Sequence, residues 1–433
     1  MVSKKELRKR VDEFEVVPTR IYVKDFGPVA EADIELKPLT VFMGPNNTGK
    51  TYISTLLLIT YEIIDLLYST NILYEYAGDE TIVLDLVKTD LEKSFARLYS
   101  VSDLGELVKR DADSGVVNIQ FKQLKDTGDS HFDVKIVVTK DGNTEMSFQM
   151  PPFRPLMSGV VYIPAERSGM MRTYKQLLRL YLESFRRFRL PPHLEESAKK
   201  IMGEESISRI RLPGVVSILL DEILSVNRFT IKERAESKYR GALELLEDET
   251  LQGVIELGED LAVTYTEKRS GQSFDLINTS SMVSEVSAIY ILTKLLRPNS
   301  WFVIEEPEAH VHPKGQMGIA RFLAALARSG VNVFITTHSD LIALKLANMV
   351  GLAKLKEDDR VSLGYRPDEY LEREKLALYF MDPEDLTAKR IEVSETGEVE
   401  ELPTYSKVVE EMYGEAVNLL KLHGKIPTLS HTE

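Results

Sequence analysis

The sequence predicts an α/β fold whose core is a mostly parallel sheet built around a phosphate-binding loop. A glycine-rich segment, Gly44-Pro45-Asn46-Asn47-Thr48-Gly49-Lys50-Thr51, follows one apolar run. A second apolar run, residues 301–304, ends in two adjacent glutamates, and a third, residues 331–336, leads into His338. Helix-like segments alternate with these apolar runs, and strands that alternate with helices form a parallel sheet.

The expected elements follow one another in a core that a long block interrupts. Strands are predicted within residues 20–43 and at residues 116–121, 131–138, 160–164, 301–304, 331–336 and 390–393. Helices are predicted at residues 52–67, 74–95, 174–189, 215–227, 233–246, 282–296, 316–328 and 407–421. We expect four units. Residues 1–70 and 261–345 form the two parts of the core, residues 71–260 an inserted block of strands and helices, and residues 346–433 a small C-terminal α/β extension.

The glycine-rich segment has the spacing G-x-x-x-x-G-K-[ST] in the strand–loop–helix setting of a P-loop. Its glycines let backbone N–H groups turn inward around a phosphate, and the helix that follows adds its positive dipole end. Lys50 can reach the outer phosphates, and the Thr51 hydroxyl can bind Mg²⁺. The loop therefore predicts nucleoside triphosphate binding by residues 46–51, which are Asn46, Asn47, Thr48, Gly49, Lys50 and Thr51.

Two carboxylates at the end of a buried strand predict hydrolysis. Glu305 can hold Mg²⁺, directly or through water, and Glu306 can polarise the water that attacks the terminal phosphate. His338 comes directly after the next apolar strand, so it is expected at the same sheet edge, where it can donate a hydrogen bond to that phosphate. His310 and His312 resemble a metal pair, but without a third ligand we expect packing and turn roles for them.

Together these motifs resemble the ATP-binding-cassette (ABC) ATPases. GPNNTGKT at residues 44–51, VIEEPEAHVHP at residues 303–313 and TTHSD at residues 336–340 are most similar to the branch of the overcoming-lysogenization-defect (OLD) proteins and stand-alone AAA-domain ATPases. The resemblance covers residues 20–67 and 261–340. It implies ATP as the nucleotide, where the residues alone leave ATP and GTP open, and a homodimer with two ATP molecules between the subunits.

The resemblance also implies a serine-containing signature segment that faces the partner's phosphate loop. Ser280 and Ser281 are the best match, although Met282 stands where the family usually has a glycine, so the contact serine stays open between the two. The family's glutamine loop has no glutamine here, and Glu166 or Arg167 is its possible substitute. The spaced carboxylates of the branch's topoisomerase–primase nuclease domain are missing after His338, so a nuclease would be a separate polypeptide.

Composition limits the metal sites, the cellular location and the partners that the protein can have. The 433 residues carry a net charge of −14 and no cysteine, which excludes disulfides and cysteine-based metal sites. No apolar stretch is expected to reach the length of a membrane span, and no signal peptide is evident, so we expect a cytoplasmic protein without a membrane partner. Residues 167–189 oppose the acidic average and could grip a nucleic-acid backbone with Arg167, Arg172, Lys175, Arg179, Arg186, Arg187 and Arg189.

Two functions from different classes remain open. The first is an ATP-driven dimerisation switch in DNA transactions or anti-phage defence, motivated by the cassette motifs and the basic stretch. The second is an interaction module that uses ATP binding to gate a partner nuclease or toxin. A transporter subunit is disfavoured because the Leu-Ser-Gly-Gly-Gln signature is absent, and a metabolic kinase because Glu305, Glu306 and His338 form a hydrolase arrangement.

Overall fold

The computed structural model describes residues 13–77, 80–124, 131–148, 154–173, 218–219, 222–223, 238–258, 262–399 and 405–423. The strands are β1 (Glu13–Phe26), β2 (Val29–Glu35), β3 (Leu39–Met43), β4 (Ser114–Gln123), β5 (His131–Thr139), β6 (Thr144–Phe148), β7 (Arg154–Leu156), β8 (Val160–Ile163), β9 (Gly253–Leu257), β10 (Val263–Glu267), β11 (Ser273–Asp275), β12 (Trp301–Glu305), β13 (Asn332–Thr337), β14 (Leu376–Met381) and β15 (Ala388–Ile391). The α-helices are α1 (Lys50–Ala77), α2 (Glu80–Tyr99), α7 (Arg240–Leu245), α8 (Ser281–Thr293), α9 (Pro313–Arg328), α10 (Asp340–Leu352), α11 (Glu357–Ser362) and α12 (Tyr405–Leu422).

A mixed sheet in the order β15-β14-β3-β13-β12-β8 forms the centre of the molecule. All of its pairs are parallel except β14 with β15. Strands β3, β12 and β14 are buried along their whole length, because helices and a second sheet cover the two faces. Parallel strands end at the same edge, so the loops after β3, β8, β12 and β13 meet there.

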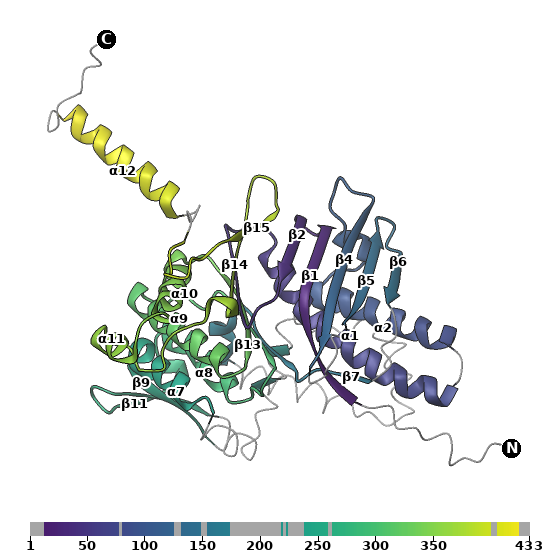
Figure 1. Cartoon of the computed structure of the whole chain (residues 1–433), viewed down its shortest axis with the longest axis horizontal. Helices are drawn as coiled ribbons and strands as arrows, with labels where there is room; N and C mark the ends of the chain where they lie inside the picture. Colours follow the sequence, from purple (N-terminus) through teal and green to yellow (C-terminus); the bar gives the residue numbers. More distant parts are fainter. Residues whose placement is uncertain are drawn as a thin grey trace, which may run out of the picture.

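The two faces of the central sheet belong to two different cores. Leu39, Val41 and Met43 pack with helices α8, α9 and α10 on one face. Phe42 and Phe334 point to the other face, where they pack with α1 and with the antiparallel sheet β2-β1-β4-β5-β6. Figure 1 shows this division: α8, α9 and α10 lie to one side of β13 and β14, and α1, α2 and the antiparallel strands to the other.

The structure confirms the predicted α/β fold and most of its elements. The predicted strands at residues 116–121, 131–138, 301–304 and 331–336 are β4, β5, β12 and β13. The division into four units stays a prediction. Two strand pairs link the predicted insert and the predicted extension to the central sheet. Strand β8, within the predicted insert, pairs with β12, and β14, within the predicted extension, pairs with β3. The predicted helices at residues 174–189 and 215–227 lie largely outside the described residues.

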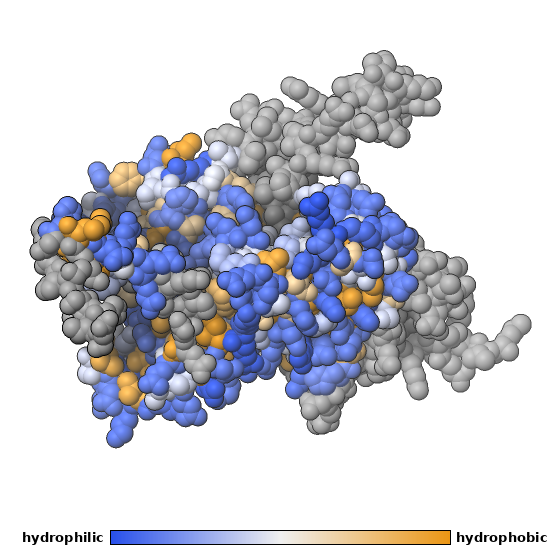
Figure 2. All heavy atoms as spheres, turned by 90° about the horizontal axis from the view of Figure 1, so that it is seen from above, coloured by the Kyte–Doolittle hydropathy of each residue, from blue (hydrophilic) through white to orange (hydrophobic). Residues whose placement is uncertain are grey.

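One described segment, Lys50–Tyr68 of α1, is long and apolar enough to cross a membrane by length and composition, with a mean hydropathy of 1.3. The expectation that no stretch reaches that length was therefore wrong. Its apolar side chains are packed inside the molecule: Ile53, Leu56 and Leu57 are fully buried in the core beneath the antiparallel sheet. On the face shown in Figure 2, the described surface is mostly hydrophilic, with apolar side chains in separate small patches.

The segment before β9 packs tightly on α9 at a glycine. Helix α7 continues into a π-helical turn, η3 (Leu246–Leu251), and a Cβ at Gly318 would lie 2.6 Å from both Glu249 Cβ and Thr250 Oγ1 of that turn. We expect Gly318→Ala to lower the free energy of unfolding by about 2 kcal/mol, because neither atom is the free end of a flexible side chain. Denaturant unfolding measures the change. Gly169→Ala is the matched control, since a Cβ there meets nothing within 4 Å, and equal stabilities for the two variants would contradict the prediction.

Candidate active site

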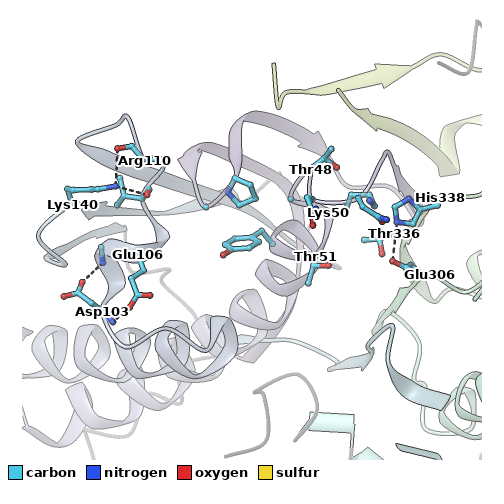
Figure 3. Close-up of a pocket in the computed structure, with 18 residues that line it drawn as sticks. Thr48, Lys50, Thr51, Asp103, Glu106, Arg110, Lys140, Glu306, Thr336 and His338 are labelled. Carbon is cyan, nitrogen blue, oxygen red and sulfur yellow. Dashed lines mark hydrogen bonds and ion pairs between the residues drawn. The ribbon is translucent and has the colours of Figure 1, made fainter. Parts of the chain in front are cut away.

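The predicted site residues of the P-loop, β12 and β13 meet at one edge of the central sheet. Thr337 pairs with Met43 and Thr336 pairs with Glu305, so the ends of β3, β13 and β12 lie side by side. A pocket of about 1130 Å³ opens there. Figure 3 shows Lys50, Thr51, Glu306 and His338 at one end of it. Asn46, Asn47, Thr48 and Gly49 also line it, so the structure brings the loop and two of the three predicted strand-end residues together in one cavity.

The phosphate loop needs a glycine at positions 44 and 49, both for backbone conformation and for space. Gly49 has φ +97°, and a Cβ there would lie 2.6 Å from Val29 Cγ2 of β2. Gly44 has φ +150°, and its Cβ would lie 2.8 Å from the backbone oxygen of Met381, at the end of β14. Both positions combine a backbone that L-residues rarely adopt with a close neighbour, so a side chain at either one would displace the loop.

Lys50 is held inside the loop and is poised to bind an anion. Its side chain is buried, and Nζ donates to the carbonyl oxygen of Pro45 at 2.6 Å. Burial lowers the pKa of Lys50 to about 8, while the negative charges of Glu306, Glu308 and Glu305 act in the opposite direction. A phosphate group would replace this carbonyl contact with a charge-assisted one.

The lowered pKa predicts that nucleotide binding weakens in alkaline solution. Above pH 8 the free protein loses the Lys50 proton, which must return when a phosphate binds, so the Kd for ATP should rise about tenfold per pH unit. Below pH 8 the Kd should be constant. Titration with a fluorescent ATP analogue from pH 7.5 to 9.5 measures this. Lys50→Arg, whose guanidinium stays charged, should show no such rise, and a flat profile for the wild-type protein would refute the assignment.

Glu305 is held in a fixed place beside Thr51. Its Oε1 accepts hydrogen bonds from Ser54 Oγ at 2.7 Å and from Tyr162 Oη at 2.8 Å, and Oε2 lies 3.4 Å from the Ala165 backbone nitrogen. Burial raises the pKa of Glu305, and hydrogen bonds from Ser54, Tyr162 and Thr51 oppose that rise. An oriented carboxylate next to a threonine hydroxyl is the kind of oxygen donor pair that Mg²⁺ takes together with water and phosphate oxygens, so these residues fit the ion.

Glu306 and His338 form a pair across the ends of β12 and β13. His338 Nε2 lies 3.3 Å from Glu306 Oε1, and both side chains are partly exposed to the pocket. The hydrogen bond from His338 lowers the pKa of Glu306, so the carboxylate is charged at neutral pH and can accept a proton from water. Glu308 fixes the backbone of the histidine, because the His338 N–H donates to its Oε1 at 2.6 Å.

The two signature serines lie outside the pocket of their own chain. Ser280 is the N-cap of α8, as its residue type predicts, and its hydroxyl accepts from the Val283 backbone N–H at 3.3 Å. Ser281 is the first residue of the helix. Arg172 fixes this segment, since it donates to the Thr279 backbone oxygen at 2.6 Å and to Ser284 Oγ at 2.9 Å.

The prediction that residues 167–189 bind nucleic acid must be corrected for Arg167 and Arg172, which the structure describes. Arg167 is fully buried and Arg172 is occupied by the segment before α8, so neither is available to a nucleic-acid backbone. The reason is that Arg167 pairs with the buried Glu285 carboxylate and donates to backbone oxygens, while Arg172 donates to the Thr279 backbone oxygen and the Ser284 hydroxyl. The other members, Lys175, Arg179, Arg186, Arg187 and Arg189, lie outside the described residues. Arg167 does not line the pocket, and the assignment of Glu166 or Arg167 as the substitute for the family's glutamine stays a prediction.

The two histidines after Glu306 have local partners. His310 Nδ1 lies 3.2 Å from Glu285 Oε1 on α8, and His312 is the N-cap of α9, where its Nδ1 accepts from the Lys314 backbone N–H. These contacts agree with the expected packing and turn roles.

Sequence reasoning missed the other end of the pocket. Tyr52, Asp103, Glu106, Arg110 and Lys140 line it, and Figure 3 shows the last four together at the end away from Lys50, Glu306 and His338. The segment of Asp103 and Glu106 is fixed by a capping box around the 3₁₀ turn η1 (Leu104–Leu107). Only Tyr52, next to Thr51, carried a local signal. The others come from segments that the antiparallel sheet brings near the loop.

Comparison with known protein families gives a match for part of the chain. A family model described as "AAA domain, putative AbiEii toxin, Type IV TA system" matches residues 170–344, a range that contains Glu305, Glu306 and His338 and begins after the P-loop. No curated protein matches the chain. The fold is that of a P-loop NTPase of the ABC-ATPase type, with the loop after β3 and the tandem glutamates after β12 at one edge of a largely parallel sheet.

Several solved structures are similar to the chain at low identity. The Smc head domain of Pyrococcus furiosus, bound to the C-terminal domain of ScpA, is 13% identical, with 92% of this chain and 100% of that chain covered and a TM-score of 0.44. The SMC head domain from Thermotoga maritima is also 13% identical, with coverage of 87% and 99% and a TM-score of 0.40. The Smc head domain derived from Pyrococcus yayanosii is 11% identical, with coverage of 92% and 100% and a TM-score of 0.46.

Proposed function

We propose that the protein binds Mg-ATP and hydrolyses it to ADP and phosphate. The observation that carries the proposal is the Glu306–His338 pair, which lines the same pocket as Lys50 and Thr51. A P-loop that only bound nucleotide would need no basic carboxylate beside the terminal phosphate. Phosphoryl transfer to water needs positioning, charge stabilisation and a group that orients the water, and this pocket holds a residue for each task.

Each residue has a distinct part in the proposed reaction. Lys50 and the backbone N–H groups of the loop bind the phosphates, and Thr51 and Glu305 hold Mg²⁺, which supplies charge stabilisation when it is bound. Glu306 orients the attacking water and accepts its proton. His338 contacts the terminal phosphate, and its hydrogen bond to Glu306 registers the loss of that phosphate. The pocket end with Tyr52, Arg110 and Lys140 takes the nucleoside.

We further propose that the protein works as a homodimer with ATP at the interface. Ser280 is an exposed N-cap outside its own pocket, which supports a contact of this helix end with a nucleotide held by a second subunit. On this proposal Ser280 or Ser281 completes the site from the partner. The similarity of the motifs to OLD-like cassette ATPases supports the same arrangement.

Two cellular roles remain proposals. A switch in DNA transactions or anti-phage defence now rests on the cassette motifs and on basic residues beyond Arg172. A module that gates a partner nuclease or toxin is supported by the matched family, whose description includes a putative AbiEii toxin and a type IV toxin–antitoxin system. Co-purification of a stable partner without DNA favours the second role, and salt-sensitive DNA affinity favours the first.

The experiment that tests the proposed reaction is phosphate release from ATP by the purified protein. We expect turnover with Mg²⁺, none with excess EDTA, and a lower kcat/KM for GTP than for ATP. A wild-type protein that binds Mg-ATP and releases no phosphate, alone and after dimer formation, would show that the chain only binds nucleotide. Transfer of phosphate to an acceptor other than water would identify a kinase.

A further inference from the structure

Arg167 is a fully buried arginine that contacts the backbone of both tandem glutamates. It follows β8, and its Nη1 donates to the backbone oxygens of Glu305 at 2.7 Å and Pro164 at 3.1 Å. Its Nη2 donates to the backbone oxygen of Glu306 at 2.9 Å. The planar fork of a guanidinium can reach two successive carbonyls in this way, which the single ammonium of a lysine cannot.

The backbone that Arg167 binds is strained. Glu306 has φ +44°, in the left-handed region that residues other than glycine rarely adopt. Such a conformation persists only where the surroundings fix it, and it is found most often at functional sites. Two contacts fix it here: the Glu306 N–H donates to the Thr336 backbone oxygen at 2.8 Å, and the Glu306 carbonyl accepts from Arg167. The strained turn points the Glu306 side chain into the pocket beside His338.

The same guanidinium is tied to α8. Its Nε lies 2.9 Å from Glu285 Oε2 and 3.3 Å from the Glu285 backbone oxygen. Glu285 is 1% exposed and lies four residues after Ser281, about one turn into the helix. Arg167 is therefore a direct polar link between the glutamate of the proposed reaction and the helix that carries the proposed partner contact.

We propose that Arg167 is a positioning residue of the ATPase site, which holds Glu306 in its reactive geometry and couples that geometry to the start of α8. The inference rests on the proposed function, since it assigns a residue to the same reaction. It predicts a defect in the chemical step with little effect on ATP binding, because the polar contacts of Arg167 go to Pro164, Glu285, Glu305 and Glu306 and not to the phosphate loop. A purely structural role predicts that stability, binding and turnover change together.

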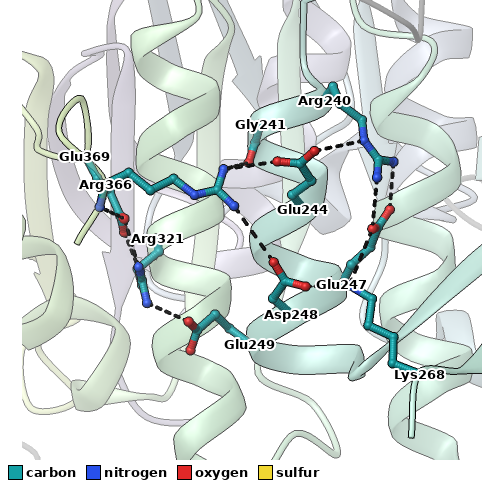
Figure 4. Close-up of polar contacts among 10 residues, drawn as sticks. All are labelled: Arg240, Gly241, Glu244, Glu247, Asp248, Glu249, Lys268, Arg321, Arg366 and Glu369. Carbon is teal, nitrogen blue, oxygen red and sulfur yellow. Dashed lines mark hydrogen bonds and ion pairs between the residues drawn. The ribbon is translucent and has the colours of Figure 1, made fainter. Parts of the chain in front are cut away.

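The test needs a variant that folds without Arg167. Removal of the arginine alone would leave Glu285 buried without its ion partner, which is strongly destabilising. The double variant Arg167→Met/Glu285→Gln removes both charges and keeps similar side-chain volumes. The matched control is Arg240→Met/Glu247→Gln, which removes another arginine paired with a buried glutamate, at 2.9 Å, on α7 and η3. Figure 4 shows that this pair belongs to a separate polar cluster, and neither residue lines the nucleotide pocket.

We expect the Arg167/Glu285 double variant to bind a fluorescent ATP analogue with a Kd within about threefold of wild type, whereas kcat falls about 100-fold, as a displacement near 1 Å can cause. Arg167→Lys, which keeps the ion pair but not the fork, should keep the melting temperature and recover only part of kcat. The Arg240/Glu247 control should keep kcat and KM within about twofold of wild type, whatever its melting temperature.

The outcomes separate the inference from the proposed function. A wild-type protein that hydrolyses ATP, together with a double variant of undiminished kcat, would overturn the role of Arg167 and leave the ATPase assignment intact. A double variant in which Kd, KM and melting temperature all change in parallel with kcat would assign Arg167 a structural role only. Absence of hydrolysis in the wild-type protein would instead refute the proposed function, and the inference with it.

Discussion

Glu306→Gln is expected to lower kcat for ATP hydrolysis about 1000-fold, within the range that a general base contributes, and to leave ATP binding intact. The amide can still accept the hydrogen bond from His338, so the local structure should persist, but it cannot take a proton from water. The side chain is 38% exposed, so the substitution leaves no cavity. Phosphate release and the Kd of a fluorescent ATP analogue measure the two effects separately.

The same variant tests the proposed dimer, since it should hold ATP without consuming it. We expect its mass in solution, measured by light scattering behind a sizing column, to rise from monomer to dimer when Mg-ATP is added. A permanent dimer would mean that ATP reshapes an existing interface, and a permanent monomer would contradict the sandwich arrangement. Glu256→Gln, an exposed position on β9, is the control. Full turnover by Glu306→Gln would remove Glu306 from its role.

Lys50→Ala is expected to weaken ATP binding by at least about 100-fold, the effect of losing a strong charge-assisted contact to the phosphates. The fold should survive, because the change removes a buried cation that donates its hydrogen bond to the Pro45 carbonyl, within the same loop. Isothermal titration with Mg-ATP measures the loss, and thermal unfolding without nucleotide checks the fold. Lys93→Ala, at an exposed position of α2, is the control. An ATP affinity equal to that of the wild-type protein would exclude Lys50 as a phosphate ligand.

The parts of the site that were predictable from the sequence are those encoded by short local segments. The phosphate loop, the tandem glutamates and His338 each follow an apolar strand directly, and parallel strands bring their carboxyl ends together without further information. The N-cap role of Ser280 was predictable for the same reason, because capping depends on a residue and the three that follow it.

The parts that were missed depend on contacts between distant segments. Strand β14 is a short apolar run among polar residues, and periodicity cannot identify such a run as a buried strand. The charge of Arg167 was visible, but its burial is decided by carbonyl groups of β12 and by Glu285, more than 100 residues away. The antiparallel sheet places Arg110 and Lys140 at the pocket. Their own neighbours in sequence do not determine this position.

The position of β14 beside β3 has a consequence for the order of events during synthesis. Strand β3 and its loop leave the ribosome early, but the backbone of Met381 packs against Gly44, and β14 is the neighbour of β3 on one side. On its other side β3 pairs with β13, which is itself made nearly 300 residues later. The phosphate loop therefore lacks its neighbouring strands until most of the chain has been translated. Such long-range pairing makes folding slow. On the proposed function, we therefore expect the chain to gain its affinity for nucleotide only late in its synthesis.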